Sequence, residues 1–311
     1  MAYEDQQSSA PSTVRENPVL VDPIEKFPKP PFERQTQSWP GLASKMNPRP
    51  DHGEESYRGS GRLAGRKALI TGGDSGLGRA AAIAYAREGA DVAISYYPDE
   101  EADAQEVVAL IRQAGRKAVA LPGDLRDEGY CTKLVADARA GLGGLDILVM
   151  NAARQQAHES ILDISSEDFD ATIKTNIYAP FWIIKAALPH LPAGSAIIGT
   201  TSEQAYDPTP DLYDYAQTKA ATMNYVKSLA KQLASKGIRV NAVAPGPFWT
   251  PLQVSGGATQ EKLQTFGSTS PMGRPGQPAE IAGLYVAAAD PALSYSTGQI
   301  FGSTGGNEQP A

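Results

Sequence analysis

The sequence contains very little cysteine and histidine. Its only cysteine, Cys131, cannot form a disulfide within the chain, and His52, His158 and His190 lack the spacing of a zinc site. Acidic residues outnumber basic ones, and the net charge is −7. Nucleic-acid binding depends on clustered Lys and Arg, so this charge argues against such a partner. The sequence therefore predicts neither a metal site nor a nucleic-acid partner.

Long apolar runs are also missing. No stretch approaches the roughly 18 uninterrupted apolar residues of a membrane-spanning helix. Met1 to Ala10 is polar and acidic, whereas a secretory signal would be basic and then apolar. We therefore expect no membrane partner and a cytoplasmic location. With 311 residues, 41% of them hydrophobic, the chain is long enough for one large domain with additions.

The first 61 residues differ in composition from the rest of the chain. They are rich in Pro, Gln, Ser and charge, and their prolines stop a helix or a central strand from running through. One interpretation is a disordered tail. The other is an arm anchored on the main domain or on a neighbouring subunit by its apolar side chains, Phe27, Phe32, Trp39 and Leu42. Residues 1–61 are thus predicted to be an extension, and residues 62–311 the main domain.

From Lys67 onward, short apolar runs alternate with longer amphipathic segments. This pattern is typical of repeated βα units around a parallel sheet, a doubly wound α/β fold of the Rossmann type. Gly89 and Gly115 stand where helices end, and Asp99, Asp127 and Ser165 can cap the helices that follow. Strands are expected at residues 67–71, 91–96, 117–121, 147–150, 196–200, 239–244 and 299–301.

One long segment interrupts this alternation. Residues 246–278 contain many Gly, Ser, Thr and Pro. Long irregular insertions in compact domains are usually functional. We interpret this segment as a substrate lid.

A glycine-rich turn follows the first strand. Thr71-Gly72-Gly73-Asp74-Ser75-Gly76-Leu77-Gly78 leads from the strand into an Ala-rich helix. Glycines let the backbone approach a pyrophosphate, and the amino end of the helix favours its negative charge. An ordinary tight loop would also contain glycines, but this turn lies where an open parallel sheet binds its nucleotide. The predicted contacts are Gly72, Asp74, Ser75, Gly76, Leu77 and Gly78.

A second motif supplies proton chemistry. Tyr215 and Lys219 are four residues apart, so on a helix they share one face. A phenol has a pKa near 10, and a nearby cation lowers it toward the range useful for proton transfer. A surface pair would show the same spacing, but Ser202 follows the fifth strand, where active sites of such sheets collect. Its hydroxyl could bind the substrate oxygen while Tyr215 transfers the proton.

The TGxxxGxG turn followed by YxxxK resembles the short-chain dehydrogenase/reductase superfamily over about residues 63–306. Three further motifs carry the resemblance: Asp124-Leu125 after the third strand, Asn151-Ala152-Ala153 after the fourth, and Pro245-Gly246-Pro247-Phe248-Trp249-Thr250 after the sixth. In the second of these motifs, Ala153 stands where the family usually has glycine, which adds a Cβ to a turn near the cofactor.

The resemblance implies hydride transfer between a nicotinamide cofactor and a carbonyl or alcohol carbon. Tyr215 would donate or accept the proton, Ser202 would stabilise the oxygen, and Lys219 would lower the Tyr215 pKa and bind the ribose. Asn176 matches the asparagine that holds a water in a proton relay. Further cofactor contacts implied are Asp124 at the adenine, then Leu125, Asn151, Ala152, Pro245, Gly246, Phe248 and Thr250.

The choice of nucleotide depends on the end of the second strand. Tyr96 stands where NAD-preferring relatives carry Asp, so NADP(H) is favoured and NAD(H) is the alternative. Arg79 is the nearest candidate cation for a 2′-phosphate, although acidic residues also lie close by. Substrate contacts are predicted from the mixed aromatic and polar residues Gln155, Gln204, Tyr206, Phe248 and Trp249.

The long Pro-rich arm together with these motifs looks like bacterial aldehyde reductases and general-stress oxidoreductases of the superfamily. It also resembles the glucose and ribitol dehydrogenase homologues. An aldehyde, ketone or sugar-like alcohol substrate and a homotetramer are implied. The tetramer would use residues 176–190, residues 214–235 and the strand near Phe301.

Two other functions remain open. A non-catalytic dinucleotide-binding sensor or scaffold could keep the fold, but Tyr215 and Lys219 are both present. An epimerase or dehydratase acting on sugar nucleotides also uses YxxxK. Those relatives usually have TGxxGxxG and a larger C-terminal region, and only about 90 residues follow Lys219 here.

Overall fold

The computed structural model describes residues 20–307 and contains one sheet of seven parallel strands in that range. The strand order is β3-β2-β1-β4-β5-β6-β7. This is the doubly wound order, so the predicted Rossmann-type fold is confirmed. The strands are β1 Lys67–Thr71, β2 Asp91–Tyr96, β3 Ala118–Pro122, β4 Ile147–Met150, β5 Ala196–Thr200, β6 Arg239–Pro245 and β7 Ile300–Ser303.

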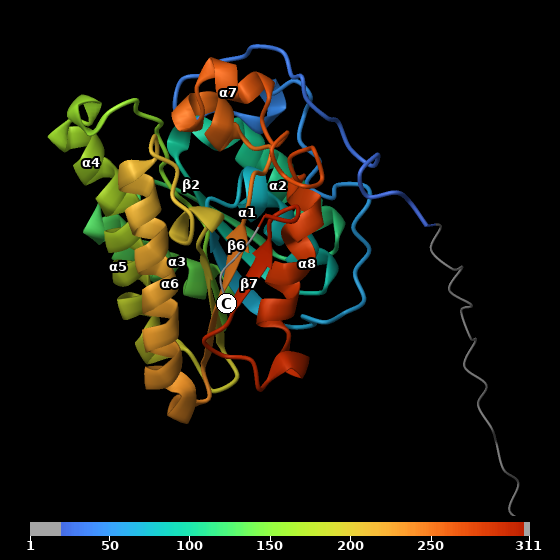
Figure 1. The fold of residues 1–311 in the computed structure, drawn as a ribbon. Coiled ribbons are helices and arrows are strands. Elements are labelled where there is room, and N and C mark those ends of the chain that lie inside the picture. Colours follow the sequence, from blue (N-terminus) through green and yellow to red (C-terminus); the bar gives the residue numbers. More distant parts are fainter. Residues whose placement is uncertain (1–19, 308–311) are drawn as a thin grey trace, which may run out of the picture.

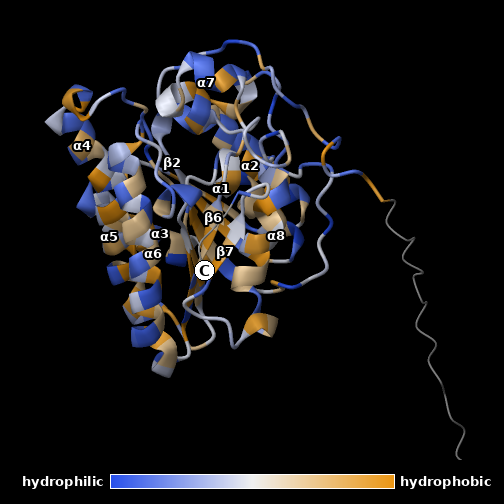
Figure 2. Ribbon diagram, in the orientation of Figure 1, coloured by the Kyte–Doolittle hydropathy of each residue, from blue (hydrophilic) through white to orange (hydrophobic). Residues whose placement is uncertain are grey.

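Helices cover both faces of this sheet (Figure 1). The face on the right of the view carries α1 (Gly76–Arg87), α2 (Glu101–Gln113) and α8 (Pro278–Ala289). The other carries α3 (Glu128–Leu142), α5 (Ala179–Ala187) and α6 (Tyr213–Leu233). Figure 2 shows the apolar strands between helices whose outer surfaces are hydrophilic. The two shorter helices are α4 (Ser166–Ile173) and α7 (Gln260–Gln264).

Most of the predicted helix ends are found where expected. Asp127 and Ser165 accept hydrogen bonds from the first turns of α3 and α4, and Gly89 and Gly115 have φ values of +96° and +73° after α1 and α2. Asp99 was predicted wrongly as a helix cap. It lies inside the short turn η2 (Pro98–Glu100), where the proline begins the turn before α2 starts at Glu101.

The order in which the chain adds strands reverses between β1 and β4, which lie side by side and run parallel. The glycine turn follows β1, and Asn151 follows β4, so both reach the crevice at the carboxyl edge of the sheet. Gly78 must be glycine here, because a Cβ at this position would lie 1.9 Å from the Gly72 carbonyl oxygen. The Asn151 side chain donates to the Thr71 and Gly72 carbonyls at 3.2 and 3.1 Å and ties the two loops together.

The arm, described from Leu20, runs past α7 and over the domain before it enters β1 (Figure 1). Phe32 is buried and stacks on Trp249, with 4.2 Å between the ring centroids. The Trp249 indole N–H donates to the Pro48 carbonyl at 2.8 Å. Of the two interpretations, the anchored arm therefore describes residues 20–61, and the anchor is the main domain of the same chain.

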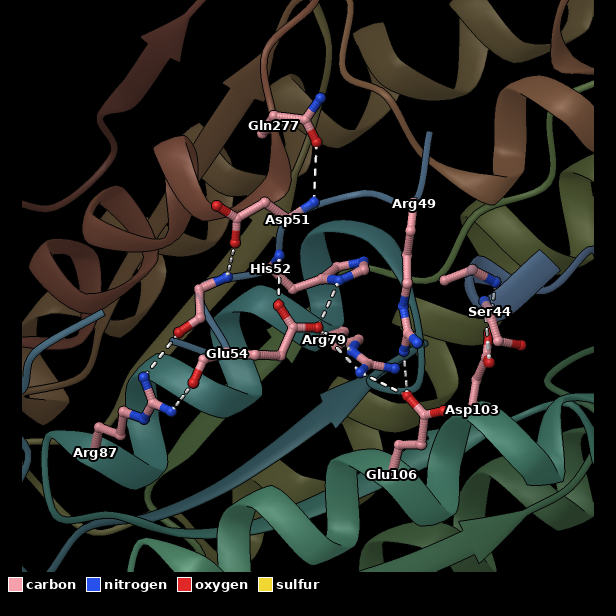
Figure 3. A network of polar contacts seen from close by, with 12 residues as sticks. Ser44, Arg49, Asp51, His52, Glu54, Arg79, Arg87, Asp103, Glu106 and Gln277 are labelled. Atoms are coloured by element: carbon pink, nitrogen blue, oxygen red, sulfur yellow. Dashed lines mark hydrogen bonds and ion pairs between the residues drawn. The ribbon is translucent and has the colours of Figure 1, made fainter. Parts of the chain in front are cut away.

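A buried ion network fastens the last part of the arm (Figure 3). Arg79 of α1 is 1% exposed and lies 3.0 Å from Glu54 of the arm and 2.9 Å from Glu106 of α2. His52 is fully buried, and its Nδ1 lies 3.0 Å from the Glu54 carboxylate. Arg87 donates to arm carbonyls in the same region. None of the described helices is long and apolar enough to cross a membrane.

Candidate active site

A cavity of about 460 Å³ lies along the carboxyl edge of the sheet. It combines the glycine turn, the loops after β2 to β6, the start of α6 and the segment around α7. Of the residues predicted from the sequence, the cavity is lined by Gly72, Asp74, Ser75, Gly76, Leu77, Tyr96, Asp124, Leu125, Asn151, Ala152, Gln155, Ser202, Gln204, Tyr215, Lys219, Pro245, Gly246, Phe248 and Thr250.

Four predicted site residues do not line this cavity: Gly78, Asn176, Tyr206 and Trp249. Trp249 has no exposed surface, because it is enclosed between Phe32 of the arm and Phe266. Its prediction as a substrate contact is therefore wrong. The sequence pattern could not show that the arm would cover this ring.

Tyr215 and Lys219 project from the first turns of α6 toward the end of β5. The Lys219 ammonium donates to the Thr200 carbonyl at 2.8 Å and lies 5.3 Å from the centre of the Tyr215 ring. The Thr201 hydroxyl donates to the Lys219 carbonyl at 2.7 Å, which joins the same helix turn to the strand. Ser202, Tyr215 and Lys219 are each at least 94% buried. The phenol, the ammonium and the hydroxyl predicted from the sequence thus line one cavity.

Burial controls the protonation of this pair. It lowers the pKa of Lys219 to about 7, because the charged ammonium loses its hydration. Burial also raises the pKa of Tyr215, while a hydrogen bond with Ser202 lowers it and the nearby Glu203 carboxylate raises it further. The expected lowering of the Tyr215 pKa by Lys219 is therefore not what these side chains produce. At neutral pH the phenol keeps its proton.

Asn176 lies in a π-helical turn, η4 (Lys174–Tyr178), between α4 and α5. Its amide oxygen accepts from the Arg154 N–H at 2.8 Å. Its amide nitrogen donates to the Arg154 carbonyl and the Thr218 hydroxyl, both at 3.0 Å. These contacts join the loop after β4 to α6, so Asn176 braces the site from outside the cavity wall. π-Helical turns of this kind are frequent at functional sites.

The opposite end of the cavity, at the carboxyl ends of β2 and β3, carries buried acids. Asp74 of the glycine turn and Glu100 of η2 are 1% and 9% exposed. Burial raises the pKa of both carboxyls above the usual range, and the charge of Asp103 raises both further. The charge of Asp74 also raises the pKa of Glu100. The pair therefore retains a proton at neutral pH. The Tyr96 hydroxyl at this end donates to Glu101 at 2.8 Å.

Arg79 does not reach the cavity. Its guanidinium is bound by Glu54 and Glu106 on the outer side of α1, so the suggestion that it grips a cofactor phosphate is wrong. The cation that lines this end is Arg126, which pairs with both Asp124 carboxylate oxygens at 2.6 to 3.0 Å. Arg126 stands two residues after Asp124 in the sequence, and that position was its only signal.

The end near Tyr215 is enclosed by the segment predicted as a lid. The Gln155 amide donates to the Gly257 carbonyl at 2.8 Å, and the Gln204 amide oxygen accepts from the Thr209 N–H at 2.8 Å. The Lys262 ammonium of α7 lies 2.6 Å from the Asp211 carboxylate, across the cavity mouth. Sequence reasoning missed Glu203, Asp211 and Lys262 as lining residues because no local motif marks them.

The strand order and the glycine turn in the cavity wall are those of a dinucleotide-binding α/β protein. A family model described as enoyl-(acyl carrier protein) reductase matches residues 72–308. The uncharacterized oxidoreductase YghA of Escherichia coli is 56% identical, covering 92% of this chain and 98% of its own. NADPH-dependent aldehyde reductase 1, chloroplastic, of Arabidopsis thaliana is 41% identical, covering 88% and 97%.

A solved structure agrees with these relatives. The short-chain dehydrogenase from Burkholderia cenocepacia in complex with NADP is 35% identical, with a TM-score of 0.73, and the match covers 79% of this chain and 98% of that one. The chain belongs to the short-chain dehydrogenase/reductase superfamily. It is thus an NAD(P)-dependent oxidoreductase.

Proposed function

We propose that this protein interconverts an aldehyde or ketone and the corresponding alcohol, with Tyr215 as the proton donor and acceptor. The observation that carries the proposal is the burial of Tyr215, Ser202 and Lys219 in one cavity with the glycine turn. An epimerase or dehydratase is less favoured, because the fold and the relatives are those of dehydrogenases and reductases.

The residues present suit a dinucleotide. At the amino end of α1, Ser75 occupies the cap position without accepting a hydrogen bond from the helix amides, which leaves them available to an anion. Gly76 has a φ of +51°, and any other residue at this position would place a Cβ 3.4 Å from the Thr250 side chain and narrow the cavity. The glycine turn would hold the phosphates, and Thr250 would contact the nicotinamide end. Lys219 would bind the adjoining ribose.

The cofactor, when bound, supplies or accepts the hydride. The protein's own part is to manage the oxygen and its proton. Tyr215 holds a proton at neutral pH and can donate it to the oxygen of a carbonyl that is being reduced, while Ser202 donates a hydrogen bond to the same oxygen. Lys219, with a pKa of about 7, is suited to return the proton, and Asn176 would support that return through a water.

NADP(H) is the favoured cofactor in this proposal, with NAD(H) as the alternative. Tyr96 replaces an acidic ribose ligand, and Arg126 lines the same end of the cavity. The names of two similar proteins refer to NADPH and NADP. The Asp74 and Glu100 pair works against a 2′-phosphate, although one shared proton leaves it a smaller negative charge than two ionised carboxyls.

Residues 246–278 are proposed to act as the substrate lid. The Lys262–Asp211 ion pair joins α7 to the loop before α6. If this pair holds the lid closed, Lys262→Ala raises KM for the substrate several-fold and changes kcat little. Lys236→Ala, on the exposed turn after α6, serves as the control.

The proposed assembly is a homotetramer, and the proposed location is the cytoplasm. Tyr178 and Phe181 of the η4–α5 segment are 45% and 56% exposed, which is unusual for large apolar side chains on a face without a partner. Sedimentation of Phe181→Ser measures the assembly, and an unchanged mass would count against this face as the interface.

The function is tested with a panel of aldehydes, ketones and polyols. Turnover is followed by nicotinamide absorbance with NADP(H) and NAD(H) in parallel. Reduction of aldehydes or ketones is the expected result. Cofactor binding without turnover on any member of the panel would favour the alternative, a non-catalytic dinucleotide-binding sensor or scaffold.

A further inference from the structure

The N-terminal arm reaches the cofactor cavity. Of its described residues, Trp39 and Pro40 line the wall, next to the loop that carries Asp124 and Arg126. The Trp39 ring lies 4.8 Å from the Tyr97 ring, with an angle of 58° between their planes. The Arg126 guanidinium lies 5.6 Å from the centre of the Trp39 ring. One residue of the extension thus joins two residues of the main domain in a single cluster.

The turn that carries Trp39 is held on both sides. The Gln37 side chain closes it, because its amide donates to the Leu42 carbonyl at 3.0 Å and accepts from the Leu42 N–H at 2.8 Å. Asp103 of α2 has no exposed surface and accepts from the Ala43 N–H at 2.6 Å. Figure 3 shows Asp103 directed at this part of the arm, beside Ser44. A fully buried carboxylate therefore fixes the arm just after Trp39.

This wall belongs to the adenosine end of the cavity. Tyr97 follows β2 and Asp124 follows β3, while Tyr215 and Lys219 lie beyond β5 on the other side of the glycine turn. A half-buried indole next to a guanidinium offers a flat, polarisable face, the surface that proteins use to stack a nucleobase. The only planar base in the proposed cofactor's nucleotide half is adenine.

We infer that Trp39 binds the adenosine half of the dinucleotide, so the N-terminal arm forms part of the cofactor site. The inference rests on the proposed function, because it takes the cavity to be a dinucleotide site. It gives the extension a role within its own subunit. Bound nucleotide should in turn stabilise the docked arm, since ligand and arm share a contact.

The test compares ligands that contain the adenosine half with one that lacks it. Dissociation constants for ADP, NADPH and reduced nicotinamide mononucleotide are measured by calorimetry for the wild type, Trp39→Ala and Trp39→Phe. Phe27→Ala is the control, because Phe27 is an aromatic residue of the same arm that packs near Arg274, outside the cavity. Loss of one base stack corresponds to about fivefold weaker binding or more.

Trp39→Ala should weaken ADP and NADPH by about this factor and leave the mononucleotide unchanged. Trp39→Phe should retain most of the affinity, and Phe27→Ala all of it. Unchanged ADP affinity in Trp39→Ala would overturn the inference and leave Trp39 a packing residue. An equal loss for the mononucleotide would also overturn it, because the arm would then act on the cavity as a whole.

A second measurement does not depend on the alanine variant folding. The emission of Trp39, taken as the difference between the wild type and Trp39→Phe, should change when ADP is added. If the protein binds ADP but the Trp39 emission does not change, the inference about Trp39 is contradicted and the proposed function is not. If the wild type binds no dinucleotide at all, the proposed function fails as well, so the two failures are distinguishable.

Discussion

The two ends of the cavity are built in different ways. At the end that carries Tyr215, the side chains proposed for proton transfer come from one helix and one strand end, and hydrogen bonds between α6 and the end of β5 position them. At the adenosine end, the wall combines the arm, the glycine turn, η2 and the loop after β3. Burial lowers the pKa of a base, Lys219, at the first end and raises the pKa of an acid, Glu100, at the second. The proposed function thus assigns proton transfer to the first end and cofactor recognition to the second.

The largest effect is expected at the Tyr215 end. Tyr215→Phe removes the proposed proton donor and should lower kcat by about 100-fold to 10,000-fold, with little change in the dissociation constant of the cofactor. Steady-state turnover and cofactor titration measure both quantities. Tyr213→Phe, on the exposed side of the same helix turn, is the control and should retain activity. A Tyr215→Phe enzyme with full turnover would show that this phenol is not the catalytic acid.

A smaller and more selective effect is expected at the adenosine end. Arg126→Ala should weaken NADP(H) binding by about tenfold, because a charge-assisted contact to the 2′-phosphate is lost. NAD(H) binding should change by no more than about twofold, since NAD(H) lacks that phosphate. Arg139→Ala, on the exposed side of α3, controls for the change in net charge. Equal losses for both cofactors would assign Arg126 a structural role instead.

The buried base should make stability rise with pH. Between about 7 and 10.5 the unfolded chain keeps the Lys219 proton that the folded protein releases, so the free energy of unfolding increases with pH in this window. Lys219→Met should remove that slope and be the more stable protein at and below neutral pH. Urea unfolding of the cofactor-free protein across this range is the measurement. Lys227→Met, exposed on the same helix, should keep the slope.

The buried acid should have the opposite effect on stability. The pKa of Glu100 is raised above 4.5, so the folded protein holds its proton when the unfolded chain has lost it. The free energy of unfolding therefore falls as pH rises from about 4.5 through neutral, by at most about 1.4 kcal/mol per pH unit for one proton. Glu100→Gln should flatten this decline, and Asp99→Asn should not. A decline unchanged in Glu100→Gln would mean that another group carries it.

Much of the fold follows from short-range patterns. The alternation of apolar runs and amphipathic segments predicted each strand to within two residues, since burial on both faces of a parallel sheet leaves a clear signal. Asp99 failed as a cap because Pro98 began a turn one residue earlier, a competition that spacing alone does not resolve. The glycine turn and the Tyr215–Lys219 pair were predictable for the same local reason: each lies within eight consecutive residues.

Three features depended on contacts between distant parts of the chain. Trp249 moved from the predicted substrate pocket into a cluster with Phe32, more than 200 positions away. Arg79, the cation expected near the cofactor phosphate, instead pairs with Glu54 and Glu106. Arg126 lines the cavity at this end. Trp39 lines the cavity because Asp103 accepts a hydrogen bond from the turn that carries it. No periodicity encodes such pairings, because they arise when separately formed elements pack together.

The sequence by itself determined the class of chemistry: a phosphate-binding turn and a phenol–ammonium pair in chain order, on a βα scaffold whose topology brings strand ends together. The tertiary structure alone decided the protonation of that pair. Burial raises the pKa of Tyr215 and lowers that of Lys219, and this burial is created only when α6 packs against β5. It also decided that the arm belongs to the cavity. Desolvation and long-range packing are properties of the assembled fold, and local residue spacing carries no record of them.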